Sequence, residues 1–205
     1  LRHGKGLIVV INHFSLKDPP LAANEVFHHR EMGSKKVLAP IAYHMDSSWY
    51  HRLGKIIGFK LVPIVTKNTT REGKNDGHEL GEGKKEYVAA ALDLLGEGGI
   101  VILAPQGSRQ RHLGEPEATT SLLMLNAKRK KVGNFAFLFM GFGIEGVADY
   151  SDKKVRGFNP FKKYDIHIGA CLTKDELMEK ANGDIRAIDA IVYEELGKVV
   201  PASYK

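Results

Sequence analysis

Short apolar runs alternate with amphipathic stretches along the whole chain. The apolar runs cover residues 7–11, 37–42, 61–65, 100–104, 135–139 and 164–169. They are rich in β-branched residues and too short for helices, so each run predicts a β-strand. The amphipathic stretches predict helices over residues 19–31, 47–57, 82–96, 118–130, 173–181 and 184–198. Strands separated by helices indicate an α/β protein with a mixed, mostly parallel β-sheet flanked by helices.

Several predicted helices carry recognisable ends. Asp18 precedes Pro19, which predicts an N-cap followed by proline at the first helical position. The sequence "GEGG" at residues 96–99 predicts the end of the third helix. Thr173 with Glu176 predicts a capping box at the start of the fifth.

Two stretches predict long loops. Residues 66–83 are polar and rich in glycine, and we expect a mobile loop that is a candidate lid over a substrate. Residues 147–164 mix cations with aromatic residues. Within them Phe158, Phe161 and Tyr164 interleave with lysines, as in segments that contact a membrane surface.

The size and composition of the chain limit its organisation. With 205 residues, of which 43% are hydrophobic, we expect a single domain over residues 1–205. The longest nearly apolar run, residues 135–144, is about half of the ~20 residues that span a bilayer, and no signal peptide is visible. The first strand starts almost directly after Leu1, so we expect that an upstream segment, for example an anchor, is missing.

The formal net charge of +6 favours an anionic partner. A phosphate-bearing substrate, an anionic lipid surface and nucleic acid all satisfy this condition. Nucleic acid is not expected, because the chain has no RNP, zinc-finger or helix-turn-helix signature. The histidines have no spacing typical of metal ligands, so no metal is expected either.

Cys171 is the single cysteine. An intrachain disulfide is therefore impossible, which fits a reducing compartment such as the cytoplasm. Cys171 lies in the apolar run "IHIGACL", and we expect it to be a small buried residue rather than a nucleophile.

The sequence "NHFSLKD" follows the first predicted strand and contains two candidate catalytic residues, His13 and Asp18. On one helix, residues five apart point about 140° away from each other and would not meet. If His13 lies on a turn and Asp18 caps the next helix, the turn folds back and the carboxylate reaches one imidazole nitrogen. The other nitrogen is then free to take a proton. The alternative is a simple helix cap beside a polar residue at the strand end.

Two further segments carry cations at predicted strand ends. In "ILAPQGSRQR", residues 102–111, the side chains of Arg109 and Arg111 share a face on extended backbone, and guanidinium groups suit phosphate oxygens. Gly107 would permit close approach of the backbone to a ligand. Lys67 follows the strand at 61–65 and would add a phosphate contact. The alternatives are a basic surface turn and a solvated lysine.

These segments occur in the order found in the glycerolipid acyltransferase superfamily, which includes the glycerol-3-phosphate and lysophosphatidic acid acyltransferases. "NHFSLKD" resembles the family's N-H-x-S-x-x-D block, and "GFKLVPIV" resembles its second block, which leads to a cation, here Lys67. "APQGSRQR" resembles the third block, F-P-E-G-T-R, and "NFAFLFMGFGIEG" lies in the place of the apolar fourth block. The resemblance covers about residues 7 to 146.

The chain departs from the family pattern at several positions. Gln106 stands where the family usually has glutamate, and Ser108 where it has threonine. The fourth block lacks its usual proline, and Phe139 and Met140 occupy that region. The two arginines of the third block, separated by one residue, resemble those of the soluble plastid-type glycerol-3-phosphate enzymes. This similarity favours a glycerol-3-phosphate-like acceptor.

The resemblance implies a glycerol-3-phosphate acyltransferase-like fold and an O-acyltransferase of phospholipid biosynthesis. Such an enzyme moves a fatty acyl chain from acyl-CoA or acyl carrier protein to the hydroxyl of glycerol-3-phosphate or lysophosphatidic acid. His13 would remove the hydroxyl proton, Asp18 would orient His13, and backbone amides near the helix start would hold the oxyanion. The acceptor's phosphate would be bound by Lys67, Gly107, Ser108, Arg109 and Arg111. The resemblance implies no cofactor beyond the thioester, no metal, and peripheral contact with the anionic cytoplasmic face of the membrane.

Two other function classes remain open from the sequence. An acyl thioesterase or other hydrolase would use the same His13–Asp18 pair to activate water. Ser15 as its nucleophile is disfavoured, because no G-x-S-x-G elbow surrounds it. Alternatively, the basic surface would bind anionic lipid and the His–Asp pair would be catalytically silent.

Overall fold

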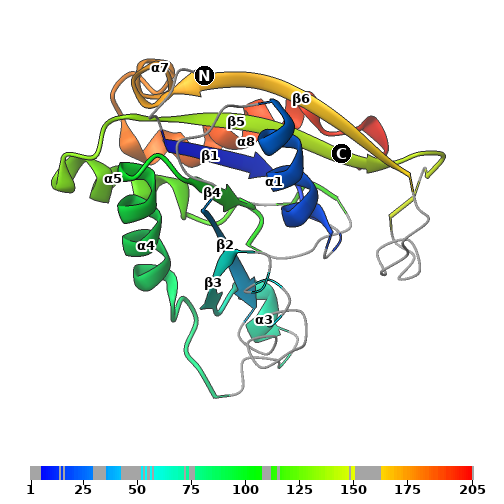
Figure 1. Cartoon of the computed structure of the whole chain (residues 1–205), viewed down its shortest axis with the longest axis horizontal. Coiled ribbons are helices and arrows are strands. Elements are labelled where there is room, and N and C mark those ends of the chain that lie inside the picture. Colours follow the sequence, from blue (N-terminus) through cyan, green and yellow to red (C-terminus); the bar gives the residue numbers. More distant parts are fainter. Residues whose placement is uncertain are drawn as a thin grey trace.

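The structure is a computed structural model, and it describes residues 6–13, 15, 17–29, 36–42, 52, 54, 56, 58–71, 73, 77–107, 112–114, 116–147, 149–150 and 163–204. Within them, one β-sheet of six strands has helices on both faces (Figure 1). The predicted α/β class with a mixed, mostly parallel sheet flanked by helices is confirmed.

All six predicted strands are present, and they form one sheet in the order β3-β2-β4-β1-β5-β6. The first five are parallel, and β6 runs antiparallel to β5 at the edge. Strands β5 and β6 extend beyond their predicted ends, because the ladder between them runs from the pair Ala136 and Thr173 to the pair Ile144 and Tyr164. The strands are β1 (Gly6–Ile11), β2 (Val37–Ala42), β3 (Phe59–Ile64), β4 (Ile100–Leu103), β5 (Phe135–Ile144) and β6 (Tyr164–Thr173).

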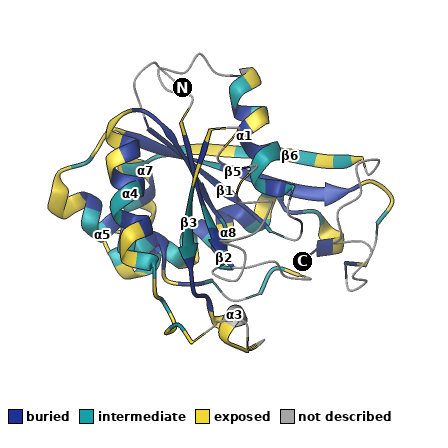
Figure 2. Ribbon diagram, turned by 60° about the horizontal axis from the view of Figure 1, so that its bottom comes forward, coloured by how far each residue is buried: buried dark blue, intermediate teal, exposed yellow. Residues whose placement is uncertain are grey.

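The helices lie on two opposite faces of the sheet (Figures 1 and 2). Helix α1 (Asp18–His29) packs against β1 and β4. On the other face, α4 (Lys84–Gly96) packs against β1 to β4, α8 (Ile188–Val199) packs against β5 and β6, and α5 (Thr120–Lys130) contacts both helices. The connections from β1 to β2 and from β4 to β5 run in opposite directions along the sheet, so right-handed crossovers place α1 and α5 on opposite faces.

The helix ends follow the local sequence signals closely. Helix α4 ends at Gly96, as predicted, and the capping box of Thr173 and Glu176 opens α7 (Lys174–Lys180). The helix expected over 184–198 consists of a 3₁₀ turn, η2 (Ile185–Ala187), followed by α8. Of the helix expected over 47–57, residues 52, 54 and 56 are helical, and the others lie outside the described residues.

The predicted loop at 66–83 has more structure than the sequence indicated. It contains the short helix α3 (Lys67–Arg71). Farther along, the backbone of Val65 exchanges two hydrogen bonds with this segment: Gly81 N–H donates to the Val65 carbonyl, and Val65 N–H donates to the Glu82 carbonyl. These bonds fasten the end of the segment to the end of β3, so the prediction of a loop along its whole length was wrong.

The core explains why the central strands are almost continuously apolar. All six residues of β1 are buried, because helices cover it from both faces (Figure 2). The edge strand β6 is different, since most of its residues are exposed or half-buried. Cys171 lies on this strand and is exposed, so the expectation of a buried cysteine was wrong. The run "IHIGACL" is apolar in composition but belongs to a strand with one neighbour in the sheet.

The carboxyl ends of the parallel strands bring three predicted site segments to one edge of the sheet. His13 follows β1, Lys67 follows β3, and Gly107 follows β4. Adjacent strands whose connections leave toward opposite faces commonly form the ligand site of open α/β sheets, and β1 and β4 are such a pair. Among the described residues, no helix is long and apolar enough to cross a membrane.

Candidate active site

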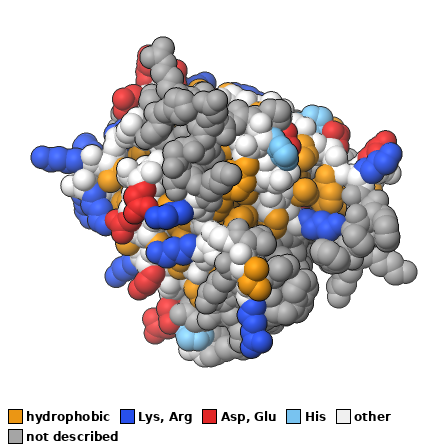
Figure 3. Space-filling model, in the orientation of Figure 1, with side chains coloured by type: hydrophobic (Ala, Val, Ile, Leu, Met, Phe, Trp, Pro, Cys, Tyr) orange, Lys and Arg blue, Asp and Glu red, His pale blue; other side chains and the backbone are white. Residues whose placement is uncertain are grey.

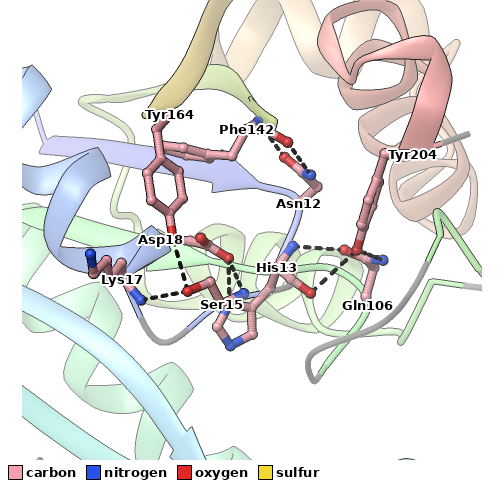
Figure 4. A network of polar contacts seen from close by, with 9 residues as sticks. All are labelled: Asn12, His13, Ser15, Lys17, Asp18, Gln106, Phe142, Tyr164 and Tyr204. Atoms are coloured by element: carbon pink, nitrogen blue, oxygen red, sulfur yellow. Dashed lines mark hydrogen bonds and ion pairs between the residues drawn. The ribbon is translucent and has the colours of Figure 1, made fainter. Parts of the chain in front are cut away.

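His13 and Asp18 form a direct contact at the carboxyl end of β1 (Figure 4). The imidazole Nδ1 of His13 lies 3.1 Å from Oδ2 of Asp18. The Asp18 side chain is completely buried, whereas 18% of the His13 side chain is exposed. The second ring nitrogen, Nε2, points away from this network, and it has no hydrogen-bond partner among the described residues. The geometry expected from the turn is therefore present, and it leaves one imidazole nitrogen for a substrate.

The turn between these residues is held together by its own polar groups. Ser15 N–H donates to Oδ2 of Asp18 at 2.7 Å, and Lys17 N–H donates to Oγ of Ser15 at 3.3 Å. Asp18 is the first residue of α1 rather than the residue before it, and Leu21 N–H donates to the Lys17 carbonyl. The carboxylate therefore faces back into the turn, where it supports the backbone and the imidazole together.

The expected oxyanion site at the start of α1 is not supported by the described residues. The amides of Ser15, Lys17 and Asp18 all donate hydrogen bonds within the turn. The next two residues are prolines, which have no N–H, and Leu21 N–H is engaged in the helix. Residues 14 and 16, whose amides also lie near the helix start, are outside the described residues, so the oxyanion site there stays a prediction.

Gln106 connects the end of β4 to the backbone of His13. The register pairs Val10 with Leu103, and His13 and Gln106 each lie three positions beyond these partners. His13 N–H donates to Oε1 of Gln106 at 3.0 Å. The Gln106 side chain is buried, so it does not face a substrate from the solvent side.

The other end of the Gln106 amide is also bonded. Its Nε2 donates to the His112 carbonyl at 3.0 Å and to the hydroxyl of Tyr204 at 3.3 Å. The Tyr204 hydroxyl in turn donates to the His13 carbonyl at 3.3 Å. Burial raises the pKa of Tyr204 well above its ordinary value, so its hydroxyl keeps its proton and remains a donor near neutral pH.

Asn12 fixes the start of the turn between His13 and Asp18 to the neighbouring strand. Its side-chain amide donates to the Phe142 carbonyl at 2.9 Å, and its side-chain oxygen accepts from Phe142 N–H at 2.6 Å. The Asn12 side chain therefore continues the pairing of β1 with β5 beyond Ile11. Because Asn12 is completely buried, these two bonds also satisfy polar groups that have no access to water.

Tyr164, at the start of β6, reaches the same turn from the edge of the sheet. Its hydroxyl donates to Oγ of Ser15 at 3.0 Å, and Nζ of Lys17 lies 5.8 Å from the centre of its ring. Burial raises the pKa of the Tyr164 hydroxyl, so the phenol stays protonated and donates. The Ser15 hydroxyl is buried and accepts hydrogen bonds from two donors, which is an unfavourable arrangement for a nucleophile.

Gly107 and Lys67 converge on a residue that the sequence did not single out, Glu117. Gly107 has a φ of 73°, and a side chain at this position would collide with the Glu117 carboxylate. Lys67 N–H donates to Oε1 of Glu117 at 3.2 Å, and Nζ of Lys84 lies 3.4 Å from Oε2. Gly107 was expected to permit close approach of a ligand to the backbone. In the structure the side chain of Glu117 occupies that space. The Lys67 residue is exposed at the exit of β3, as predicted.

Three predicted substrate-binding residues, Ser108, Arg109 and Arg111, lie outside the described residues. On the face shown in Figure 3, side chains of both charge signs are interspersed over α4 and α5. Lys130 of α5 pairs with Asp93 of α4 at 3.6 Å. The net positive charge is therefore not gathered into a uniform basic surface over these two helices.

Asn12, Glu117 and Tyr204 are the residues that sequence reasoning missed. The signal for Asn12 was a polar residue directly after the apolar run "LIVVI". For Glu117 and Tyr204 there was no local signal, because their partners are distant in sequence. In the described part of the chain, no group of three or more His, Cys, Asp or Glu side chains is arranged to hold a metal ion.

Comparison of the chain with family models and with curated proteins gave no match.

Proposed function

We propose that the protein is an O-acyltransferase of the glycerolipid type, with a glycerol-3-phosphate acyltransferase-like fold. It moves a fatty acyl chain from acyl-CoA or acyl carrier protein to the hydroxyl of a phosphate-bearing acceptor, such as glycerol-3-phosphate or lysophosphatidic acid. The observation that carries this proposal is the contact of the buried Asp18 carboxylate with Nδ1 of His13, which leaves Nε2 available. The proposed place of action is the cytoplasmic face of the membrane, by peripheral contact.

In the proposed reaction, Nε2 of His13 takes the proton of the acceptor hydroxyl as its oxygen attacks the thioester carbonyl. Asp18 holds Nδ1 protonated and stabilises the imidazolium that forms. The tetrahedral intermediate then expels the thiolate, which takes the proton from the imidazolium, and the ester product leaves. A general base in such a position contributes about 10²- to 10⁴-fold to the rate. No cofactor is required, since the thioester already carries the activated acyl group.

The proposed acceptor site consists of Lys67, Gly107, Ser108, Arg109 and Arg111. The contacts of Glu117 with both Lys67 and Gly107 support it, because they show that the segments after β3 and β4 lie side by side. The site therefore adjoins the edge at which His13 lies. A phosphate bound there would position the acceptor hydroxyl, and positioning of this kind supplies a large share of catalysis in bimolecular reactions.

The test is thiol release from acyl-CoA and from acyl carrier protein thioesters, with and without glycerol-3-phosphate or lysophosphatidic acid. His13→Ala is compared with His167→Ala, which alters an exposed histidine that pairs with Asp165 on β6 at 3.0 Å. We expect acceptor-dependent release that His13→Ala abolishes and His167→Ala leaves intact. Release without acceptor that is lost in His13→Ala would replace the transferase with a hydrolase. Equal inactivity of wild type and both variants, together with salt-sensitive binding to anionic liposomes, would replace it with a lipid-binding protein.

A further inference from the structure

The hydrogen bonds around Gln106 form a closed ring with one consistent direction (Figure 4). His13 N–H donates to Oε1 of Gln106, Nε2 of Gln106 donates to the Tyr204 hydroxyl, and that hydroxyl donates to the His13 carbonyl. The peptide groups of His13 fix this direction, because a backbone N–H can only donate and a backbone carbonyl can only accept.

The chemistry required at position 106 follows from this direction. Tyr204 has one hydroxyl proton, which it donates to the His13 carbonyl. Its oxygen can therefore only accept in the bond with Nε2 of Gln106. The His112 carbonyl also requires a donor. The residue at position 106 therefore accepts one hydrogen bond and donates two in this structure. A carboxamide does both, whereas an ionised carboxylate only accepts.

Neighbouring residues hold the members of this ring of hydrogen bonds in place. Tyr204 is completely buried, and its ring packs edge-on against Tyr150 with 5.3 Å between the ring centres. Leu113 N–H donates to the Tyr204 carbonyl at 3.0 Å, directly beside His112. Both partners of the His13 peptide groups are therefore fixed by contacts of their own.

We propose that Gln106 is a positioning residue, which together with Tyr204 holds the backbone of His13 so that the imidazole meets Asp18. The carboxamide is then the functional side chain at this position, and a glutamate there would disturb the catalytic turn. The effect on turnover rests on the proposed acyl transfer, whereas the effect on the His13 ring and on stability does not. Gln106 is 1% exposed, so its role is exerted through His13 and not on the substrate.

The main test is Gln106→Glu, which keeps the size of the side chain and removes both donated bonds. We expect kcat to fall about 10- to 100-fold with little change in the acceptor KM, because a small displacement of a catalytic group costs rate without removing binding contacts. The ¹⁵N chemical shifts of the His13 ring, which report its tautomer, should also change. Tyr204→Phe should have a smaller effect in the same direction. Tyr193→Phe is its control, since the Tyr193 hydroxyl donates to the Gly114 carbonyl outside the ring.

Thermal unfolding against pH separates this proposal from general damage. Burial beside the His112 carbonyl should raise the pKa of the introduced carboxyl group above its value of about 4.3 in the unfolded chain. The loss in Tm relative to wild type should then be smallest near pH ~4 and should grow as pH rises through the folded-state pKa. Gln106→Met has no ionisable group and should show a loss that does not vary with pH.

Two results would overturn the proposal. One is a Gln106→Glu variant whose His13 shifts and Tm at neutral pH equal those of wild type. The other is an increase in acceptor-dependent turnover in that variant, which would place residue 106 in contact with the acceptor. If wild type has neither transferase nor hydrolase activity, the proposed function fails, while the chemical shifts and the pH-dependent Tm still decide the role of Gln106.

Discussion

Replacing Asp18 with asparagine removes the negative charge beside His13 with almost no change in shape. Oδ2 of Asp18 accepts from Ser15 N–H at 2.7 Å as well as contacting Nδ1 of His13 at 3.1 Å. In the Asp18→Asn variant, the Ser15 amide therefore selects the side-chain oxygen for this position, because the NH₂ group would face another donor. The histidine should keep its tautomer and lose only the charge of its partner.

The size of the effect follows from the energy of a charged hydrogen bond. Point charges 3.1 Å apart would attract by about 5 kcal/mol at an effective dielectric constant of about 20. Desolvation of the buried carboxylate offsets part of this attraction, and hydrogen bonds to charged groups contribute about 1.5–3 kcal/mol net. That range corresponds to a loss of about 10- to 150-fold in kcat. A larger loss of about 10⁴-fold would require the wrong tautomer, which the Ser15 amide opposes.

The assay is acceptor-dependent thiol release under saturating thioester, with circular dichroism and Tm measured on the same samples. Asp165→Asn is the matched control, because Asp165 also pairs with a histidine, His167, at 3.0 Å, but on the exposed face of β6. We expect the control to retain wild-type kcat. A folded Asp18→Asn variant with kcat within about threefold of wild type would refute the reasoning, since it would show that the buried charge does not assist the histidine.

Three further substitutions test neighbouring parts of the structure. Tyr164→Phe removes the donor to Ser15 and should destabilise the protein by about 1 kcal/mol in urea unfolding; an unchanged transition midpoint would contradict this contact. Glu117→Gln removes the charge facing Lys84 and should cost about 1–2 kcal/mol, an effect that should disappear in a background of Lys84→Met. Burial raises the pKa of Tyr193 to about 12, so the free energy of unfolding should fall as pH rises from about 10 to about 12. Tyr193→Phe should remove that part of the pH dependence, and an equally steep fall in the variant would contradict it.

The strands were predictable because most of them are buried on both faces. A strand such as β1, with six buried residues, has an uninterrupted apolar sequence that periodicity detects easily. The same rule failed at Cys171, because composition alone does not distinguish an edge strand from a central one. It also failed over residues 66–83, where polar residues form α3 and two backbone bonds to Val65 that no hydrophobic pattern reveals.

In the candidate site too, contacts between residues close in sequence were predictable, and contacts between distant residues were not. The His13–Asp18 contact spans five residues, so turn chemistry and a helix start were enough to predict it. The contact of His13 with Gln106 spans 93 residues, and it depends on the register of β1 and β4. The sequence identified Gln106 as a departure from a family pattern, but its hydrogen bonds to His112 and Tyr204 became visible only in the structure.

The hydrogen bond between Tyr204 and the His13 carbonyl joins residues that are 191 positions apart. Contacts of such high sequence separation carry the largest loop-closure entropy and tend to form late in folding. His13 is therefore expected to reach its final position only after the sheet, α8 and the 3₁₀ turn η3 (Ala202–Tyr204) have assembled. Hydrogen exchange should find the turn between His13 and Asp18 opening together with η3 as one cooperative unit, separate from the slower-exchanging strands of the core.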